Sequence, residues 1–325
     1  MRKTLQDQER LCGVDEALED IRKRRPALAE IAESQALLLK ARQAVAQALP
    51  GTSLLGVAPD PACLTLGHPL LGGLLEGLAG DPDPELCARF RTAARLMLPA
   101  AAQAFPKLAP ELATVAVRLD ASGDAAHSGG GLAAELLRVL SAAGPGPQGL
   151  EALALALDVS AAAAGIAATE TLYAILGHEA GILGAMVDQE AWRRGHCPVC
   201  GGGPDVGIMK EGREDSEFLI AKAGQLWLHC GQCGALWRHP RLCCVGCGCE
   251  DHERLELLVA GEGGQDHERA QLCHACGTYL NMVNLVDRTD RVNLEMLAAG
   301  LLHLDVLAQE KGFRPLTPSP WNSLS

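Results

Sequence analysis

The segment Cys197-Pro198-Val199-Cys200-Gly201 carries a pattern that recurs three times further along the chain: two cysteines, separated by two residues, directly followed by glycine. The other copies are Cys230/Cys233 with Gly234, Cys244/Cys247 with Gly248, and Cys273/Cys276 with Gly277. Two intervening residues let both thiolates face one cation, and the glycine can adopt a left-handed conformation that turns the following N–H groups toward sulfur. Each copy is therefore predicted to be a metal-binding knuckle.

Two knuckles supply four thiolates, which suit a tetrahedral zinc or iron site, so four knuckles predict two sites. Four pairs can be grouped in three ways. We favour the sequential grouping because a hairpin predicted between Cys200 and Cys230 would fold the second knuckle onto the first, and a comparable loop separates Cys247 from Cys273. The two interleaved groupings remain alternatives. The predicted metal ligands are Cys197, Cys200, Cys230 and Cys233 at one site and Cys244, Cys247, Cys273 and Cys276 at the other.

Two further cysteines, Cys243 and Cys249, crowd the third knuckle. The glycine after Cys247 selects Cys244/Cys247 as the pair, which leaves the other two as bystander thiols or, alternatively, as redox-sensing or spare ligands. The histidines that adjoin the knuckles are His196, His229 and His274. Because four sulfurs already complete each site, these rings are expected beside the metal sites or at the surface.

The cysteines also indicate the compartment. Ten of the 13 lie between Cys197 and Cys276, which in a reducing cytosol favours metal over disulfides. The first 35 residues are charged throughout and contain no apolar core of a secretory signal. The longest uncharged stretch, 43–59, has 17 residues and is interrupted by Pro50, short of the about 20 apolar residues that a spanning helix needs. We expect a cytoplasmic protein without a membrane span.

Composition gives the fold class. A chain of 325 residues predicts about two domains, and 48% hydrophobic against 21% charged residues predicts a folded chain. Aromatic residues are only 3%, so Leu, Ala and Val should form the core and helices should pack through small side chains. The net charge is −12, and residues 195–325 alone carry 11 Lys and Arg against 17 Asp and Glu, a net charge of −6. This charge opposes binding to nucleic-acid phosphates.

The order of patterns predicts an α+β chain: an all-α N-terminal domain over 1–194, a first small metal-binding β module over 195–242, and a second over 243–325 with a C-terminal helix and tail. Helices are predicted over 26–49, from Asp83-Pro84 onward, and over 293–309, with the tail from 314 loosely ordered. Predicted strands are 218–222 and 225–229, joined by a tight turn, 255–260, and 279–286.

No catalytic residue and no organic cofactor site is expected. The chain lacks a Walker A loop, a nucleophile elbow and an H-E-x-x-H motif, and a closed site of four cysteines leaves no open position for substrate. His178-Glu179 is interpreted as a pair on a helix surface, and the arginines at 89 and 95 as a solvated basic row. The sequence therefore predicts a protein that is not an enzyme.

The C-terminal residues resemble the FdhE family of formate dehydrogenase accessory proteins. The similarity lies in Cys197 to Pro204, Leu228-His229-Cys230 with Trp237, the knuckle from Cys244 to Cys247, and the ending Cys273-His274-Ala275-Cys276-Gly277-Thr278-Tyr279-Leu280 before a final helix. It covers residues 195–314. Four knuckles in this order, followed by that ending, are specific to the family, whereas a single knuckle occurs in many unrelated proteins and is weak evidence for it.

The resemblance implies two rubredoxin-like or zinc-ribbon-like modules behind a helical domain, with iron favoured and zinc possible at the two metal sites. It also implies a role in maturing a respiratory formate dehydrogenase before twin-arginine export. The implied partner is the catalytic subunit, with its twin-arginine leader as a secondary partner, and no nucleic acid. Competing hypotheses are a rubredoxin-like electron carrier and a zinc-ribbon nucleic-acid-binding protein.

Overall fold

The computed structural model describes residues 11–55, 62–121, 131–141, 146–211, 224–259, 267–286 and 291–323. They form two compact units. The helical unit comprises Glu33–Met186 with Val199–Gly201, and the sheet unit comprises Met1–Ala32, Val187–Pro198 and Gly202–Ser325. The predicted fold class is confirmed, because a helical region is followed by a sheet region with two four-cysteine clusters and then by C-terminal helices.

The helices of the N-terminal half include several short 3-10 turns, labelled η. Their bounds are α2 Val14–Arg24, η1 Pro26–Leu28, α3 Ala29–Ala48, α4 Ala62–Leu66, α5 Gly72–Glu76, η2 Gly77–Ala79, α6 Pro84–Ala104, η3 Pro106–Leu108, α7 Ala109–Ala121, α8 Gly131–Arg138, α9 Gly146–Ala156, α10 Ala161–Leu183 and η4 Gly184–Met186. The helix predicted over 26–49 is thus present as η1 followed by α3.

In the helical unit, α10 packs against α6 through small side chains, as the composition predicts. Buried alanines on α6, such as Ala93 and Ala101, and on α10, such as Ala164 and Ala168, allow close approach. The predicted cap of α6 is also confirmed, since the Asp83 carboxylate accepts hydrogen bonds from the N–H groups of Glu85 and Leu86.

The surface predictions for this unit are wrong at Arg89 and at Glu179, whereas Arg95 is exposed as predicted. Arg89 is 3% exposed and Glu179 is 0% exposed, and the guanidinium donates to the carboxylate at 3.0 Å. The same carboxylate accepts from the Ser53 hydroxyl at 2.6 Å and from the N–H of Leu54. Both charges are buried because each has several partners from distant segments, which a single-helix pattern does not reveal.

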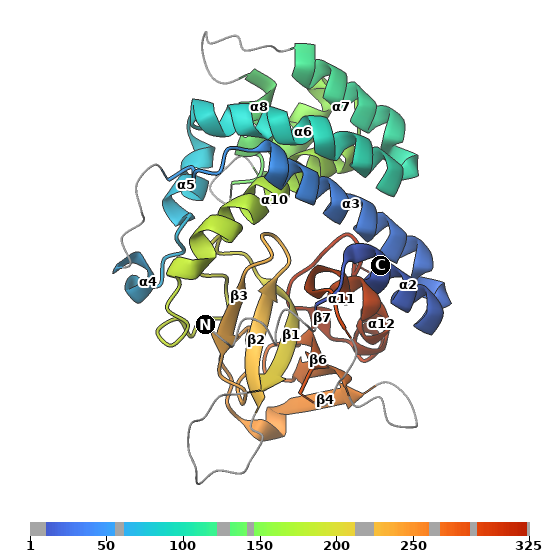
Figure 1. The fold of residues 1–325 in the computed structure, drawn as a ribbon, viewed down its shortest axis with the longest axis vertical. Helices are drawn as coiled ribbons and strands as arrows, with labels where there is room; N and C mark the ends of the chain where they lie inside the picture. The colour runs from blue at the N-terminus through green and yellow to red at the C-terminus, as the bar shows by residue number, and fades with distance from the viewer. Residues whose placement is uncertain are drawn as a thin grey trace. The chain divides into compact units, whose positions relative to one another are not determined.

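The described strands of the sheet unit form one seven-stranded sheet in the order β3-β2-β1-β6-β5-β4, with β7 paired to part of β6. Figure 1 shows β3, β2 and β1 side by side, with β6 beyond them. The bounds are β1 Pro204–Glu211, β2 Gly224–Cys230, β3 Leu236–His239, β4 Leu255–Val259, β5 Glu268–Cys273, β6 Thr278–Asn284 and β7 Arg314–Pro315.

The sheet is built from two copies of one layout. Each copy runs knuckle, strand, strand, knuckle, strand, giving β1-β2-β3 in the first copy and β4-β5-β6 in the second. In both copies the middle strand ends at the first cysteine of the following knuckle, Cys230 or Cys273. The copies join where β1 pairs in parallel with β6, with Gly207 opposite Met282. The sheet unit is therefore a duplicated module, with one copy around each pair of knuckles.

The strand predicted over 225–229 is present as β2, and the hairpin between Cys200 and Cys230 is formed by β1 and β2. Both edges of β2 are taken, by β1 over Pro204–Glu211 and by β3 over Leu236–His239. The other predicted arm, 218–222, lies outside the described residues. The strands predicted over 255–260 and 279–286 correspond to β4 and β6, with residue 260 outside the described range.

One face of the sheet is covered by the C-terminal helical region, η6 Leu294–Met296, α11 Leu297–Gly300 and α12 Leu302–Glu310. The predicted helix over 293–309 is thus broken near Leu301. Its apolar side is buried, because Leu297, Leu301, Leu304 and Ala308 share a core with the sheet. The sheet contributes to that core Val206, Ile208, Ala270, Leu272, Tyr279 and Val283.

The tail is more ordered than predicted. Its strand β7 pairs in parallel with Thr278 and Tyr279, and the N–H of Leu316 donates to the Tyr279 carbonyl at 2.9 Å. Farther on, the Gln309 amide donates to the carbonyl of Asn322 at 2.8 Å. The tail pairs with the part of the β6 edge that β1 does not reach, so its backbone groups form hydrogen bonds there. The three prolines of the tail give no indication of this pairing with a distant strand.

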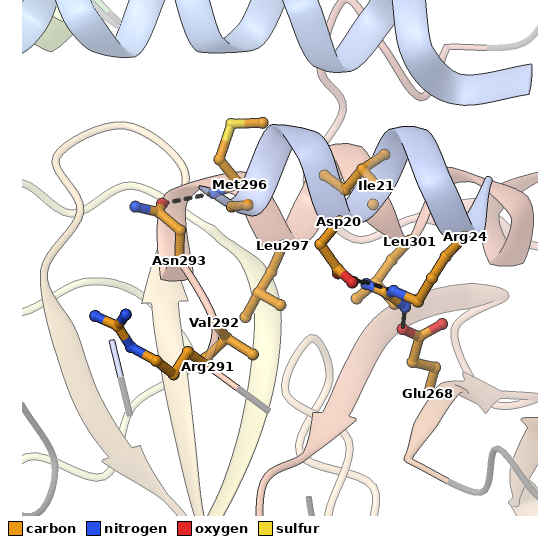
Figure 2. A pocket seen from close by; sticks show the side chains of 12 residues that line it. Asp20, Ile21, Arg24, Glu268, Arg291, Val292, Asn293, Met296, Leu297 and Leu301 are labelled. Carbon is orange, nitrogen blue, oxygen red and sulfur yellow. Dashed lines mark hydrogen bonds and ion pairs between the residues drawn. The ribbon is translucent and has the colours of Figure 1, made fainter. Parts of the chain in front are cut away.

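Helix α2 stands at the start of the chain yet packs within the sheet unit. Arg24 donates to Asp20 on its own helix at 2.8 Å and to the buried Glu268 of β5 at 2.9 Å (Figure 2). Arg25 also pairs with Glu268. The cavity beside this pair, bordered by Ile21 and Leu301, measures about 20 Å³, room for one water and not for an organic ligand.

Among the described residues, no single helix has the length and apolar character needed to cross a membrane. The segments Gly146–Ala156 and Ala161–Met186 pass that test only as a pair bent by 106°.

Candidate metal centres

The structure brings the eight predicted cysteines together in two groups. The first cluster consists of Cys197, Cys200, Cys230 and Cys233, and the second of Cys244, Cys247, Cys273 and Cys276. Within each cluster all four sulfur atoms lie within 4.8 Å of one another. This is the sequential grouping that the hairpin argument favours, and all eight thiols are free of disulfides.

The sulfur spacing suits a single tetrahedral ion. Metal–sulfur bonds of about 2.3 Å place the corners of a tetrahedron about 3.8 Å apart. The Sγ atoms of Cys197 and Cys233 lie 3.6 Å apart in the first cluster. In the second, Cys244 lies 3.7 Å from Cys276, and Cys247 lies 3.7 Å from Cys273. Each cluster could therefore hold one metal ion.

The glycines after the knuckles have the conformation that the pattern predicts. Their φ angles are 80° at Gly201, 72° at Gly234, 72° at Gly248 and 69° at Gly277. In three of the four knuckles the glycine N–H also donates to the carbonyl of the first cysteine, at 2.8–2.9 Å. A side chain at these positions would strain the turn that brings the two sulfurs of a knuckle together.

The two clusters differ in exposure. All four cysteines of the first are buried, whereas in the second Cys247 is exposed and Cys276 is partly exposed. Burial raises the pKa of the Cys244 and Cys273 thiols. Since a metal binds thiolates, the cation must supply the free energy that keeps these buried sulfurs ionised.

Thr278 is the residue near the second cluster that sequence reasoning missed. Its hydroxyl lies 3.0 Å from the Cys276 sulfur. Burial raises the pKa of the Cys276 thiol, but hydrogen bonds from the Thr278 side chain and backbone, together with those from Cys247 and Cys273, outweigh it and lower the pKa to about 7. A hydroxyl residue two positions after the last knuckle cysteine is the signal that identifies this contact.

The three histidines lie outside both clusters. His229 is buried, and its Nδ1 lies 2.7 Å from the Asp205 carboxylate. His274 is exposed and pairs with Glu256 at 3.0 Å, and the carbonyl of His196 accepts from the Trp192 indole at 2.9 Å. The Asp205 partner of His229 comes from the start of β1, a strand that the sequence did not predict.

Cys243 and Cys249 also lie outside the clusters. Cys243 is buried, with its sulfur 3.7 Å from the Pro240 carbonyl, and burial raises the pKa of its thiol. Cys249 supports the knuckle through its backbone, because its carbonyl accepts from the N–H of Cys244 at 2.8 Å.

No family model matches the chain. Curated relatives match part of the chain: a protein FdhE homolog of Aquifex aeolicus (strain VF5) is 32% identical over 129 residues, which cover 39% of this chain and 41% of that protein. A protein FdhE homolog of Haemophilus influenzae (strain PittGG) is 30% identical over 118 residues, covering 36% of this chain and 35% of that protein. These matches span about two fifths of the relatives' length.

The resemblance to the FdhE family is confirmed. The crystal structure of the FdhE protein from Pseudomonas aeruginosa matches the fold with a TM-score of 0.55 and 24% identity, over 94% of this chain and 93% of that one. Because the match covers 94% of the chain, the likeness in fold to that FdhE protein includes the helical unit as well as the sheet unit.

Proposed function

We propose that this chain is an accessory factor for formate dehydrogenase formation, which binds the catalytic subunit of that enzyme in the cytoplasm before twin-arginine export. The observation that carries the proposal is the pair of four-cysteine clusters in a chain whose fold matches an FdhE protein over 94% of its length. The accessory role comes from the family resemblance, and the clusters supply the chemistry.

We further propose that each cluster holds one metal ion, with iron as the favoured metal and zinc as the alternative. Four thiolates complete a tetrahedral site and leave no open position for a substrate, which supports a non-catalytic role. Ferric iron in a four-sulfur site absorbs visible light through thiolate-to-metal charge transfer, whereas zinc does not. Protein purified without air from iron-replete cells should turn red on oxidation, and a colourless chain with two zinc ions would contradict the iron assignment.

The partner is tested by co-purification of the tagged chain with the formate dehydrogenase catalytic subunit. We expect capture under reducing or oxidising conditions, and failure under both would refute the accessory role. A twin-arginine leader offers a basic stretch that the net charge of −12 could attract. Titration of the isolated leader at rising salt tests this secondary contact, which should weaken as salt screens the charges.

The exposure of Cys247 favours one second candidate, a rubredoxin-like electron carrier, because an exposed ligand gives electrons a short route to the metal. The two functions differ in a measurable property. A carrier must cycle its iron reversibly between two oxidation states at a physiological rate, whereas a maturation factor need not.

A further inference from the structure

The sheet of the sheet unit has a second face, opposite the face on which the C-terminal helices pack. The C-terminal helices pack on the side of Val206 and Ile208, so the alternating side chains of β1, β4, β5 and β6 point to the opposite face. A groove of about 540 Å³ lies on that opposite face. Its apolar lining includes Met209, Met282, Leu255, Leu257 and Leu242.

Two apolar side chains of this groove are highly exposed, although Met282 at its floor is buried. Leu242 is 79% exposed and Leu257 is 53% exposed, and Val259, two residues along the same strand face, is also exposed. A contiguous apolar surface on a folded protein marks a binding site more often than a solvated face. The volume alone does not select the occupant, because small-molecule sites span a similar range of about 300–1,000 Å³. The accessory function proposed above gives the chain a protein partner, and the occupant considered is therefore a polypeptide segment of that partner.

The charges of the groove indicate what kind of segment it takes. Arg241 and Arg269 line it, together with His252 and one carboxylate, Glu250. Arg241 is exposed and also donates to the Gly224 carbonyl at 3.0 Å. This local balance is basic although the whole chain has a net charge of −12. A segment with carboxylates complements the two guanidinium groups, whereas a basic twin-arginine leader would be repelled by them.

We propose that this groove binds an apolar segment bearing carboxylates, contributed by the mature catalytic subunit and not by its leader. The inference rests on the accessory function proposed above and names the surface and the chemistry of the contact. Leu242 and Leu257 supply apolar contact, and Arg241 and Arg269 select acidic over basic side chains.

Peptide binding to the metal-loaded full chain tests the chemistry. The probes are two short fluorescent peptides of leucine, valine and serine, one with glutamates and one with lysines in the same positions. The glutamate peptide should bind at least about tenfold more tightly, since each favourable or unfavourable charge contact changes affinity by that order, and added salt should reduce the difference. Equal affinity for the two peptides would overturn the proposal.

Substitutions locate the site. Leu242→Glu and Arg269→Ala should each weaken the glutamate peptide about tenfold. Leu155→Glu is the matched control, because Leu155 is 83% exposed in the helical unit and should leave affinity unchanged. Thermal unfolding would show that all three variants are folded. Unchanged binding by Leu242→Glu, or an equal loss in the Leu155→Glu control, would contradict the groove.

Capture of the catalytic subunit separates this inference from the function on which it rests. If the wild-type chain captures the subunit, Leu242→Glu should capture much less of it, whereas equal capture overturns the groove and leaves the accessory role intact. If the wild-type chain captures none, the accessory role fails, and the peptide comparison still decides whether the groove selects acidic apolar segments.

Discussion

The two cysteine clusters share one local design and differ in what surrounds them. In both, two knuckles with left-handed glycines hold four sulfurs at spacings that suit one tetrahedral ion. The first cluster is buried on all sides, whereas the second exposes Cys247 and is supported by the Thr278 hydroxyl. Four cysteines in the same knuckle arrangement thus differ in exposure between the two copies, because exposure is set by the surrounding residues and not by the knuckles themselves.

The largest expected effect comes from removing a knuckle. Structural sites of this kind contribute on the order of 10 kcal/mol to folding. Cys230→Ser/Cys233→Ser should lose one metal and unfold the sheet unit, because it leaves polar groups buried without a cation. Cys244→Ser/Cys247→Ser should also lose one metal but stay folded with a lower Tm. Metal analysis and circular dichroism measure both.

Two results of that experiment would contradict the account. Full metal content in Cys244→Ser/Cys247→Ser would show that the third knuckle uses other cysteines. A greater loss of stability in that variant than in Cys230→Ser/Cys233→Ser would reverse the assignment of the first cluster as the more structural one.

The aromatic residues that follow the last knuckle of each copy give a second difference. The Trp237 indole donates to the Arg194 carbonyl at 2.9 Å, whereas the Tyr279 hydroxyl donates to the Asp305 carboxylate at 2.6 Å. Burial raises the pKa of Asp305 to about 6, despite hydrogen bonds from Tyr279 and Asn281 that lower it. The aromatic residue of the second copy therefore contacts a buried carboxyl group, on α12, whose ionisation opposes folding.

Asp305→Asn tests this difference. Between about pH 4 and 6 the folded chain retains a proton on Asp305 that the unfolded chain has released, so this residue's contribution to stability falls as pH rises, by up to about 1.4 kcal/mol per pH unit. In urea unfolding, the free energy of unfolding of wild type minus that of Asp305→Asn should fall as pH rises. Trp237→Phe, which removes no titratable group, should keep the wild-type pH slope, and a constant difference for Asp305→Asn would be inconsistent with the raised pKa.

A chelator should remove the two metals at different rates. With zinc in both sites, a chromogenic chelator should remove one metal at least about tenfold faster than the other, because Cys247 is exposed and its thiolate can exchange ligands first. The fast phase should be missing in Cys244→Ser/Cys247→Ser. A fast phase that persists in this variant would assign the accessible metal to the first cluster.

The smallest effect is expected at Thr278. Thr278→Val removes a hydrogen bond that lowers the pKa of Cys276, so protons should displace the second metal at a higher pH, by about half a unit. Thr278→Ser keeps the hydroxyl and should behave like wild type. Identical acid-release curves for the valine and serine variants would show that the Thr278 hydroxyl does not help to retain the second metal.

The parts of this molecule that sequence predicts are those fixed by neighbouring residues. The glycine after each cysteine pair selected Cys244/Cys247 from a crowded run, and the structure groups the same two sulfurs. Asp83 before a proline predicted the start of α6. In both cases the physical cause, a turn conformation or a cap, lies within a few residues.

The parts that sequence does not predict depend on distant partners. Strand β1 contains Gly207 and is stabilised by its parallel pairing with β6. Glu179 resembles a surface residue until Arg89 and Ser53 surround its carboxylate. The tail is ordered only because β6 leaves it an edge. In each case the stabilising contact lies far away in the chain, where local periodicity carries no information.

Native mass spectrometry of the full chain, purified anaerobically in reductant, tests the central claim most directly. The account predicts a single dominant species with two metal ions per chain and no disulfide among the 13 cysteines. A chain that holds one metal or none, or that carries disulfides in place of metal, would contradict it.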